Sequence, residues 1–226
     1  MMRLPLPALL SLNAGYVDAA GFLALQGLFT AHVTSNLVTF GASAIYGTSG
    51  AIAKLLALPT FCAVVVAVRL LQFGLRRLDL PEVRTMLTLK FLLLVMAATL
   101  AITLGPFSDH DSHWALATGM TLVAAMAVQN AVHYTHLSDT PPSTLMTGSS
   151  TQIMLDVADL IDGVPADRRV QIRARLGKLS SAILAFVLGC GLAAGGYVFW
   201  GMWCFVVPPL LTVMLFFADV ASLQSR

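Results

Sequence analysis

The residue of this sequence best suited to chemistry is Asp18, a carboxylate in the middle of an otherwise apolar run over residues 6–28. An acid at membrane depth costs about 2.5 kcal/mol or more on insertion scales, which makes it a functional-site hypothesis by default. We therefore predict that Asp18 binds a proton or a cation, or anchors a polar ligand. The alternative is a structural acid, either protonated or paired with a neighbouring helix.

Asn13 lies five residues before Asp18. At about 100° per residue the two side chains point about 140° apart, so they face different neighbours. Asn13 is therefore predicted to form an interhelical hydrogen bond.

A second polar group falls in the apolar run over 114–136. Gln129, His133 and His136 follow one another at i, i+4 and i+7, with Asn130 alongside. Such spacing puts them on one helix face. As a functional stripe they would face Asp18 and line a pathway, with His133 able to carry protons. The alternative is that the two histidines lie at a helix C-terminus, where the dipole favours a cation.

Two polar clusters each precede a short apolar segment, 37–46 and 145–161. Ser, Thr and Asn are good N-caps. If the segments are re-entrant half-helices, the N–H groups at their N-termini point at a solute near mid-membrane. The alternative is a helix lying at the interface, which the three aspartates of 145–161 favour for the second segment. The clusters are His32, Thr34, Ser35 and Asn36, and Thr144, Thr147, Gly148, Ser149 and Ser150.

Other chemistries have little support. His110, Asp111 and His113 have metal-ligand side chains, but no fourth ligand has a clear spacing, so a solvated loop is expected. The three cysteines are far apart within apolar runs, which predicts reduced thiols. No hydrolase, metalloprotease, phosphate-loop or dinucleotide motif is present, so we expect no enzyme and no cofactor. The net charge of +2 is too small to suggest nucleic-acid binding.

The amino-acid composition indicates the class of protein in which these residues lie. Hydrophobic residues make up 58% of the 226 residues and charged residues only 11%, against about 25% charged in soluble domains. This predicts one all-α polytopic membrane domain over 1–226. Its six spans are expected at about 6–28, 55–72, 86–104, 114–136, 179–196 and 197–217, with Pro208-Pro209 kinking the last one.

The basic residues give the topology. With six crossings, twelve of the thirteen fall on the side of the N-terminus and only Lys54 falls opposite. The positive-inside rule then places both termini in the cytoplasm. Arg69, near the end of its span, is expected to snorkel to the interface. The twelve are Arg3, Arg69, Arg76, Arg77, Arg84, Lys90, Arg168, Arg169, Arg173, Arg175, Lys178 and Arg226.

A weak internal repeat relates the halves 6–104 and 114–217. NAGYVD at Asn13 is echoed by NAVHYT at Asn130, and AHVTSN at Ala31 by TLMTGS at Thr144, at offsets of 117 and 113 residues. Three crossings per half would give the halves opposite orientations. Inverted repeats with broken segments near a central site are a recurring transporter plan.

The runs AGYVDAAGFLALQGLFTAHVTSNLV, MAVQNAVHYTHL and STLMTGSSTQ resemble the YoaK-type bacterial inner-membrane proteins, a family classed as a domain of unknown function. Ser35 stands where the family pattern usually has glycine. The resemblance implies a six-helix integral protein of the bacterial inner membrane and supplies no substrate.

Together these features favour a small secondary transporter or facilitator for a small polar or ionic solute, with a homodimer as a compatible assembly. The alternative is a non-transporting scaffold or regulatory membrane protein that binds a partner or anionic lipid through the basic loop at 168–178. The predicted solute or ion site consists of Asp18, Asn13, Thr34, Asn36, Gln129, Asn130, His133 and Thr147.

Overall fold

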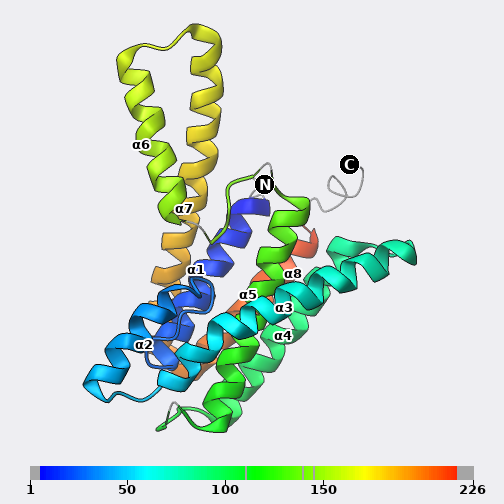
Figure 1. Cartoon of the computed structure of the whole chain (residues 1–226), viewed down its shortest axis with the longest axis vertical. Helices are drawn as coiled ribbons and strands as arrows, with labels where there is room; N and C mark the ends of the chain where they lie inside the picture. Colours follow the sequence, from blue (N-terminus) through cyan, green and yellow to red (C-terminus); the bar gives the residue numbers. More distant parts are fainter. Residues whose placement is uncertain (1–5, 110, 139, 145, 218–226) are drawn as a thin grey trace.

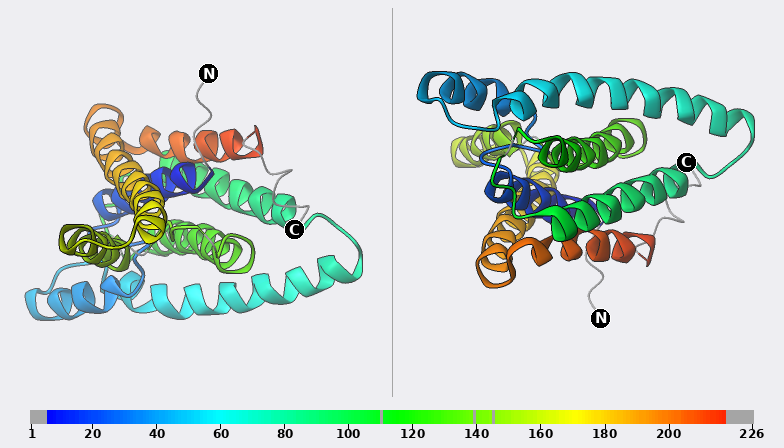
Figure 2. Two further views of the ribbon diagram at one scale, coloured as in Figure 1. Left: turned by 90° about the horizontal axis from the view of Figure 1, so that it is seen from above. Right: turned by 90° about the horizontal axis from the view of Figure 1, so that it is seen from below.

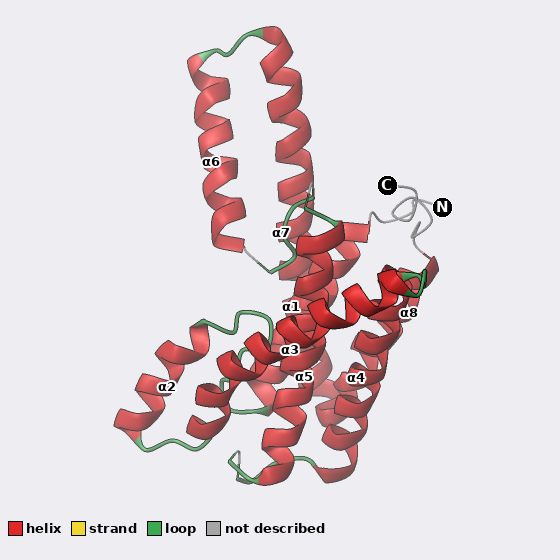
Figure 3. Cartoon of the chain, turned by 45° about the vertical axis from the view of Figure 1, so that its right-hand side comes forward, coloured by secondary structure: helices red, strands yellow, loops and turns green. Residues whose placement is uncertain are grey.

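The computed structural model describes residues 6–109, 111–138, 140–144 and 146–217, and within these ranges all regular structure is helical. Arg3, His110, Leu145 and Arg226, which entered the predictions above, lie outside the described residues. The helices, drawn in Figures 1 and 3, are α1 (Leu6–Ala24), α2 (Ser35–Tyr46), α3 (Ala51–Arg77), α4 (Glu82–Leu104), α5 (His113–His136), α6 (Met146–Asp162), α7 (Ala166–Trp200), the 3-10 helix η1 (Gly201–Val206) and α8 (Val207–Phe217).

Five helical stretches in the described chain are long and apolar enough to cross a membrane: α1, α3, α4, α5 and the stretch Ala166–Phe216, which joins α7, η1 and α8. The last stretch reverses direction. Leu215 near its end packs with Leu9 at the start of α1, whereas Met202 in η1 lies against Gly105 after α4. The expectation of a multi-pass, all-helical membrane protein is confirmed.

The boundary expected at Gly196–Tyr197 is wrong. α7 continues to Trp200, and the chain turns at Gly201, whose φ of +54° suits glycine. Pro208 and Pro209 consequently fall in the first turn of α8, where helix N–H groups have no intrahelical acceptor. The two prolines therefore lie at the start of a helix. The prediction that they kink the last span is wrong.

The core of the bundle is the contact between α1 and α7, which packs two helix backbones together. A Cβ placed on Gly189 would lie 2.1 Å from the Leu12 carbonyl oxygen, and one on Gly15 would lie 2.1 Å from the Phe186 carbonyl oxygen. Small residues allow this close approach in membrane bundles. α1 is therefore buried on most of its faces, Asp18 included.

Other helices pack around this pair in a regular pattern. α3 and α4 both pack on α5, α8 packs on α1, and α2 packs on α3 (Figure 2). α6 and the first half of α7 form a hairpin that projects beyond the bundle, at the end where α1 begins and α8 ends (Figure 1). Inside this hairpin the buried Asp156 carboxylate accepts hydrogen bonds from the Arg175 guanidinium. Since that guanidinium favours the ionised form, the pKa of Asp156 is lowered from its usual value.

Candidate functional site

Asp18 holds the loop that interrupts the chain between α1 and α2. Its Oδ1 accepts hydrogen bonds from the backbone N–H groups of Thr30 and Ala31, at 2.7 and 2.8 Å. Its Oδ2 lies 2.7 Å from His32 Nδ1. Asp18 is buried, with about 5% of its surface exposed. Its carboxylate accepts hydrogen bonds from N–H groups that have no helical acceptor, because the backbone is irregular in this segment.

Asn36 closes the same loop from its other end. Its Oδ1 accepts from the Phe29 N–H at 2.8 Å, and its Nδ2 donates to the Phe29 carbonyl at 2.7 Å. The loop also packs closely on α1, because a Cβ on Gly21 would lie 2.8 Å from the Thr30 methyl group. Asp18 and Asn36 thus fix the irregular segment between α1 and α2.

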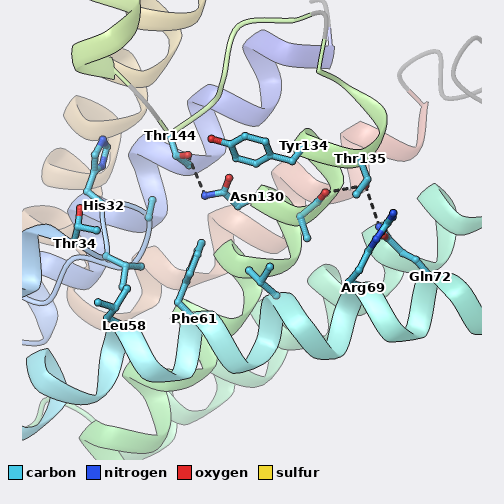
Figure 4. Close-up of a pocket in the computed structure, with 14 residues that line it drawn as sticks. His32, Thr34, Leu58, Phe61, Arg69, Gln72, Asn130, Tyr134, Thr135 and Thr144 are labelled. Carbon is cyan, nitrogen blue, oxygen red and sulfur yellow. Dashed lines mark hydrogen bonds between the residues drawn. The ribbon is translucent and has the colours of Figure 1, made fainter.

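The loop forms one wall of a cavity of about 400 Å³, which we call the central cavity. Its other walls are α3, α5 and the loop that precedes α6, so both interruptions of the helical pattern meet there (Figure 4). A guanidinium, amides and hydroxyls line it beside aliphatic and aromatic side chains. The lining residues are Ala31, His32, Val33, Thr34, Leu58, Phe61, Val65, Arg69, Gln72, Asn130, Ala131, Tyr134, Thr135 and Thr144.

His32 also borders a second, more open hollow of about 530 Å³ on the far side of the loop. Asp18, Phe186 and Cys190 line this hollow, and the His32 ring packs edge-on against Phe186 with 5.2 Å between ring centroids. The Asp18–His32 pair therefore lies between the two hollows.

A chain of polar contacts leads from the central cavity to the end of the bundle. Arg69 donates to Gln72 Oε1 at 3.2 Å, and Gln72 donates to Thr135 Oγ1 at 3.1 Å (Figure 4). Thr135 Oγ1 lies 2.7 Å from His136 Nδ1. His136 Nε2 in turn lies 3.3 Å from Glu82, which also pairs with Arg76. The wall of the cavity is thus connected to ionisable residues at the ends of three helices, α3, α4 and α5.

Another polar network ties α4 and α5 to the start of the chain. Lys90 is fully buried and donates to Gln129 Oε1 at 2.5 Å. Gln129 Nε2 donates to the Leu10 carbonyl at 3.0 Å and to Ser143 Oγ at 2.9 Å. No carboxylate of the described residues forms an ion pair with Lys90.

The predicted site residues separate into three groups. Thr34 and Asn130 line the central cavity, and Asn130 bridges to Thr144 at 3.3 Å. Asp18 contacts His32, which lines the cavity. Asn36 is hydrogen-bonded to Phe29 at the other end of the same loop. The remaining four lie elsewhere: Asn13 bonds to Thr212 of α8, as its predicted interhelical role requires, Gln129 bonds to Lys90, His133 packs on Tyr134, and Thr147 is exposed on α6.

Sequence reasoning missed Arg69, Gln72, Tyr134 and Lys90. Arg69 and Gln72 are three residues apart in an otherwise apolar helix, a spacing that puts both on one face. Arg69 had been expected to snorkel to the interface, yet it lines the cavity. Lys90 had been counted only among the basic residues on the side of the N-terminus, whereas it is buried in the bundle. Both are charged residues within a span, a signal available from the sequence alone.

A family model described as "Protein of unknown function (DUF1275)" matches residues 6–218. The chain belongs to this family. The match confirms the resemblance noted from the sequence, and it runs through every helix of the DUF1275 bundle from α1 to α8. No curated protein and no solved structure matches the chain.

Proposed function

We propose that this DUF1275 protein is a small secondary transporter or facilitator for a small polar or ionic solute, and that the central cavity holds the solute. The observation that carries the proposal is the meeting of two interrupted segments at one cavity inside a helical bundle, where polar side chains interrupt a mainly apolar wall. Irregular backbone at membrane depth is tolerated where it lines a cavity, and solute sites of secondary transporters are built at such breaks.

The packing pattern supports an inverted repeat with six crossings. In such a repeat, α1 corresponds to α5, α2 to α6, α3 to α7 and α4 to α8, so each contact can be compared with the contact between the corresponding helices. The contact of α1 with α7 then becomes that of α5 with α3, α8 on α1 becomes α4 on α5, and α2 on α3 becomes α6 on α7. One pair of side-chain contacts shows the same correspondence. Ser43 of α2 accepts a hydrogen bond from Lys54 of α3. Asp156 of α6, which lies 113 positions after Ser43, accepts one from Arg175 of α7.

The two equivalent contacts differ in tightness, as alternating access requires of a resting conformation. α1 and α7 meet backbone to backbone at Gly15 and Gly189. On α5, the residue 117 positions after Gly15 is Val132, and it packs with Val68 of α3. The larger side chains keep α3 and α5 further apart, on the side where the central cavity lies. A rocking motion would close this side and loosen the other.

In this proposal Asp18 and His32 form the coupling element. The loop they hold separates the central cavity from the second hollow. A change in the charge of the pair would change how firmly Thr30 and Ala31 are held. In this proposal the bundle lies in the bacterial inner membrane, as the family resemblance implies. The positive-inside rule would then put both termini in the cytoplasm, and a homodimer is compatible with the small size of the chain.

One observation favours a second candidate function, a scaffold or regulatory protein. The α6–α7 hairpin projects from the bundle (Figure 1) and exposes Arg168, Arg169 and Arg173. Basic clusters beside a membrane bind anionic lipid or acidic partners. In this case the polar residues of the cavity would serve packing alone.

Purified protein in proteoliposomes on a solid-supported membrane separates the two functions. We would apply pH jumps and a panel of metabolites and ions to wild type, Asp18→Asn and the control Asp79→Asn, which changes an exposed loop aspartate. A substrate-dependent current lost only in Asp18→Asn supports transport. Absence of current together with flat radiotracer uptake of the same panel supports the scaffold.

A further inference from the structure

The only arginine lining the central cavity, Arg69, has no carboxylate to neutralise it within the described chain. Its recorded partners are the Gln72 side-chain oxygen at 3.2 Å and the Phe73 ring, whose centroid lies 4.5 Å from the guanidinium carbon. The ion pairs formed by described residues involve Asp18, Glu82 and Asp156, and none includes Arg69. An arginine in a membrane span is costly unless something compensates its charge.

Among the described residues that line the rest of the cavity, none is an acid. Asp18, the nearest acid on the loop side, turns its carboxylate to the loop N–H groups and to His32. The polar groups that line the cavity beside Arg69 are amides, hydroxyls and the His32 ring (Figure 4). A cationic solute would meet an uncompensated guanidinium there, so the electrostatics disfavour it.

The arrangement of the lining residues restricts the class of solute further. Leu58, Phe61 and Val65 follow one another on α3 at i, i+3 and i+7, and they lead directly to Arg69 at i+11. The wall of α3 is thus an apolar strip that ends at a guanidinium. The guanidinium carbon lies over the Phe73 ring, 4.5 Å from its centroid. A planar guanidinium matches a carboxylate through two parallel hydrogen bonds.

We propose that the central cavity binds a small organic carboxylate, with its charged group on Arg69 and its apolar body along Leu58, Phe61 and Val65. The inference rests on the proposed function in that it names the solute class of the same site. Inorganic phosphate is a poor fit, because most of the wall offers it no hydrogen-bond donors. An anionic lipid headgroup presents related chemistry from another source, and the experiment separates the two.

The test is equilibrium binding to the full chain in nanodiscs, with benzoate, its neutral analogue benzamide and its cationic analogue benzylamine as probes. Inorganic phosphate and a series from acetate to naphthoate complete the panel. Each probe is measured against wild type, Arg69→Gln, Arg69→Lys and Arg77→Gln. Arg77→Gln is the matched control, since Arg77 is exposed at the end of the same helix. Nanodiscs of phosphatidylcholine alone and with phosphatidylglycerol provide the lipid arm.

We expect saturable binding of benzoate and weaker or no binding of benzamide and benzylamine. Arg69→Gln should weaken benzoate about tenfold or more, the usual consequence of losing a charged hydrogen bond. Arg69→Lys should weaken it less, and Arg77→Gln should bind as wild type does. Circular dichroism and melting of each variant show whether it is folded. If Arg69→Gln fails to fold, the comparison of benzoate with benzylamine in wild type tests the inference, since only the carboxylate should bind tightly.

Equal binding of benzylamine, unchanged binding in folded Arg69→Gln, or phosphate binding in preference to every carboxylate would overturn the inference. So would displacement of benzoate by phosphatidylglycerol, which would assign the guanidinium to lipid. Absence of carboxylate binding overturns this inference alone, whereas the proposed function fails only if no solute of the transport panel is moved.

Discussion

The Asp18 carboxylate and the His32 ring lie 2.7 Å apart at the centre of an interruption between two helices. The same carboxylate accepts hydrogen bonds from two backbone N–H groups of this interruption. The structure thus shows the structural role that the sequence left as one alternative. In the transport proposal the same side chain would also carry the functional role. A substitution at Asp18 must be read out in stability and in transport separately.

Asp18→Asn tests this combination. Its amide oxygen can still accept from Thr30 and Ala31, but the pairing of a negative charge with His32 is lost. We expect a loss of about 1–3 kcal/mol in the free energy of unfolding, typical for a weakened buried hydrogen-bonding group, together with loss of solute-dependent current. Thermal melting and current are measured on the same preparation, with Asp79→Asn as control. Full transport by folded Asp18→Asn would remove Asp18 from the coupling mechanism.

Gly189→Ala should separate α1 from α7. The added Cβ would lie 2.1 Å from the Leu12 carbonyl oxygen, so the two backbones must move apart. Overpacking of this kind costs about 1–3 kcal/mol or more, which should appear as a lower melting temperature. The control is Gly191→Ala in the same helix, where the new methyl group meets open space. Equal melting of both variants would contradict the close packing.

Lys90 and Gln129 should behave as one unit. Lys90→Met leaves Gln129 Oε1 buried without its donor, and Gln129→Leu leaves the ammonium group buried without its acceptor. Each single change should cost about 1–3 kcal/mol. The double variant should cost less than their sum, because it removes both orphaned groups. Strict additivity in a double-mutant cycle of unfolding free energies would show that the contact is energetically unimportant.

The sequence predicted the helix positions, and two of its eight predicted site residues, Thr34 and Asn130, line the central cavity. Particular residues show why it went no further. Asn13 could be assigned an interhelical bond, because an amide in a buried helix must find a partner. Which helix supplies the partner of Gln129 depends on the packing of α4 on α5, and no local pattern contains that information. The stripe of Gln129 and His133 was therefore assigned to a pathway, although Gln129 bonds to Lys90.

The central cavity illustrates the same limit. Thr34 and Asn130 were identified because polar residues interrupt an apolar run, and both line the cavity. Arg69 was placed at the interface, because its distance from the helix end allows snorkelling. Only the position of α3 beside α5 turns its side chain towards Thr135 and the cavity. Helical periodicity gives the face on which a residue lies, but not what that face meets.

The hairpin of α6 and α7 should loosen in acid. Hydrogen bonding to Arg175 lowers the pKa of Asp156 in the folded state, so this contact contributes stability above the unfolded value near 3.8 and loses it as pH falls through the lower folded value. Hydrogen-exchange protection factors of α6 should therefore be level at neutral pH and fall below about pH 4. Asp156→Asn should start lower and vary less with pH. Asp162→Asn, at the exposed end of α6, should follow wild type. The same acid dependence in Asp156→Asn as in wild type would show that another group controls the hairpin.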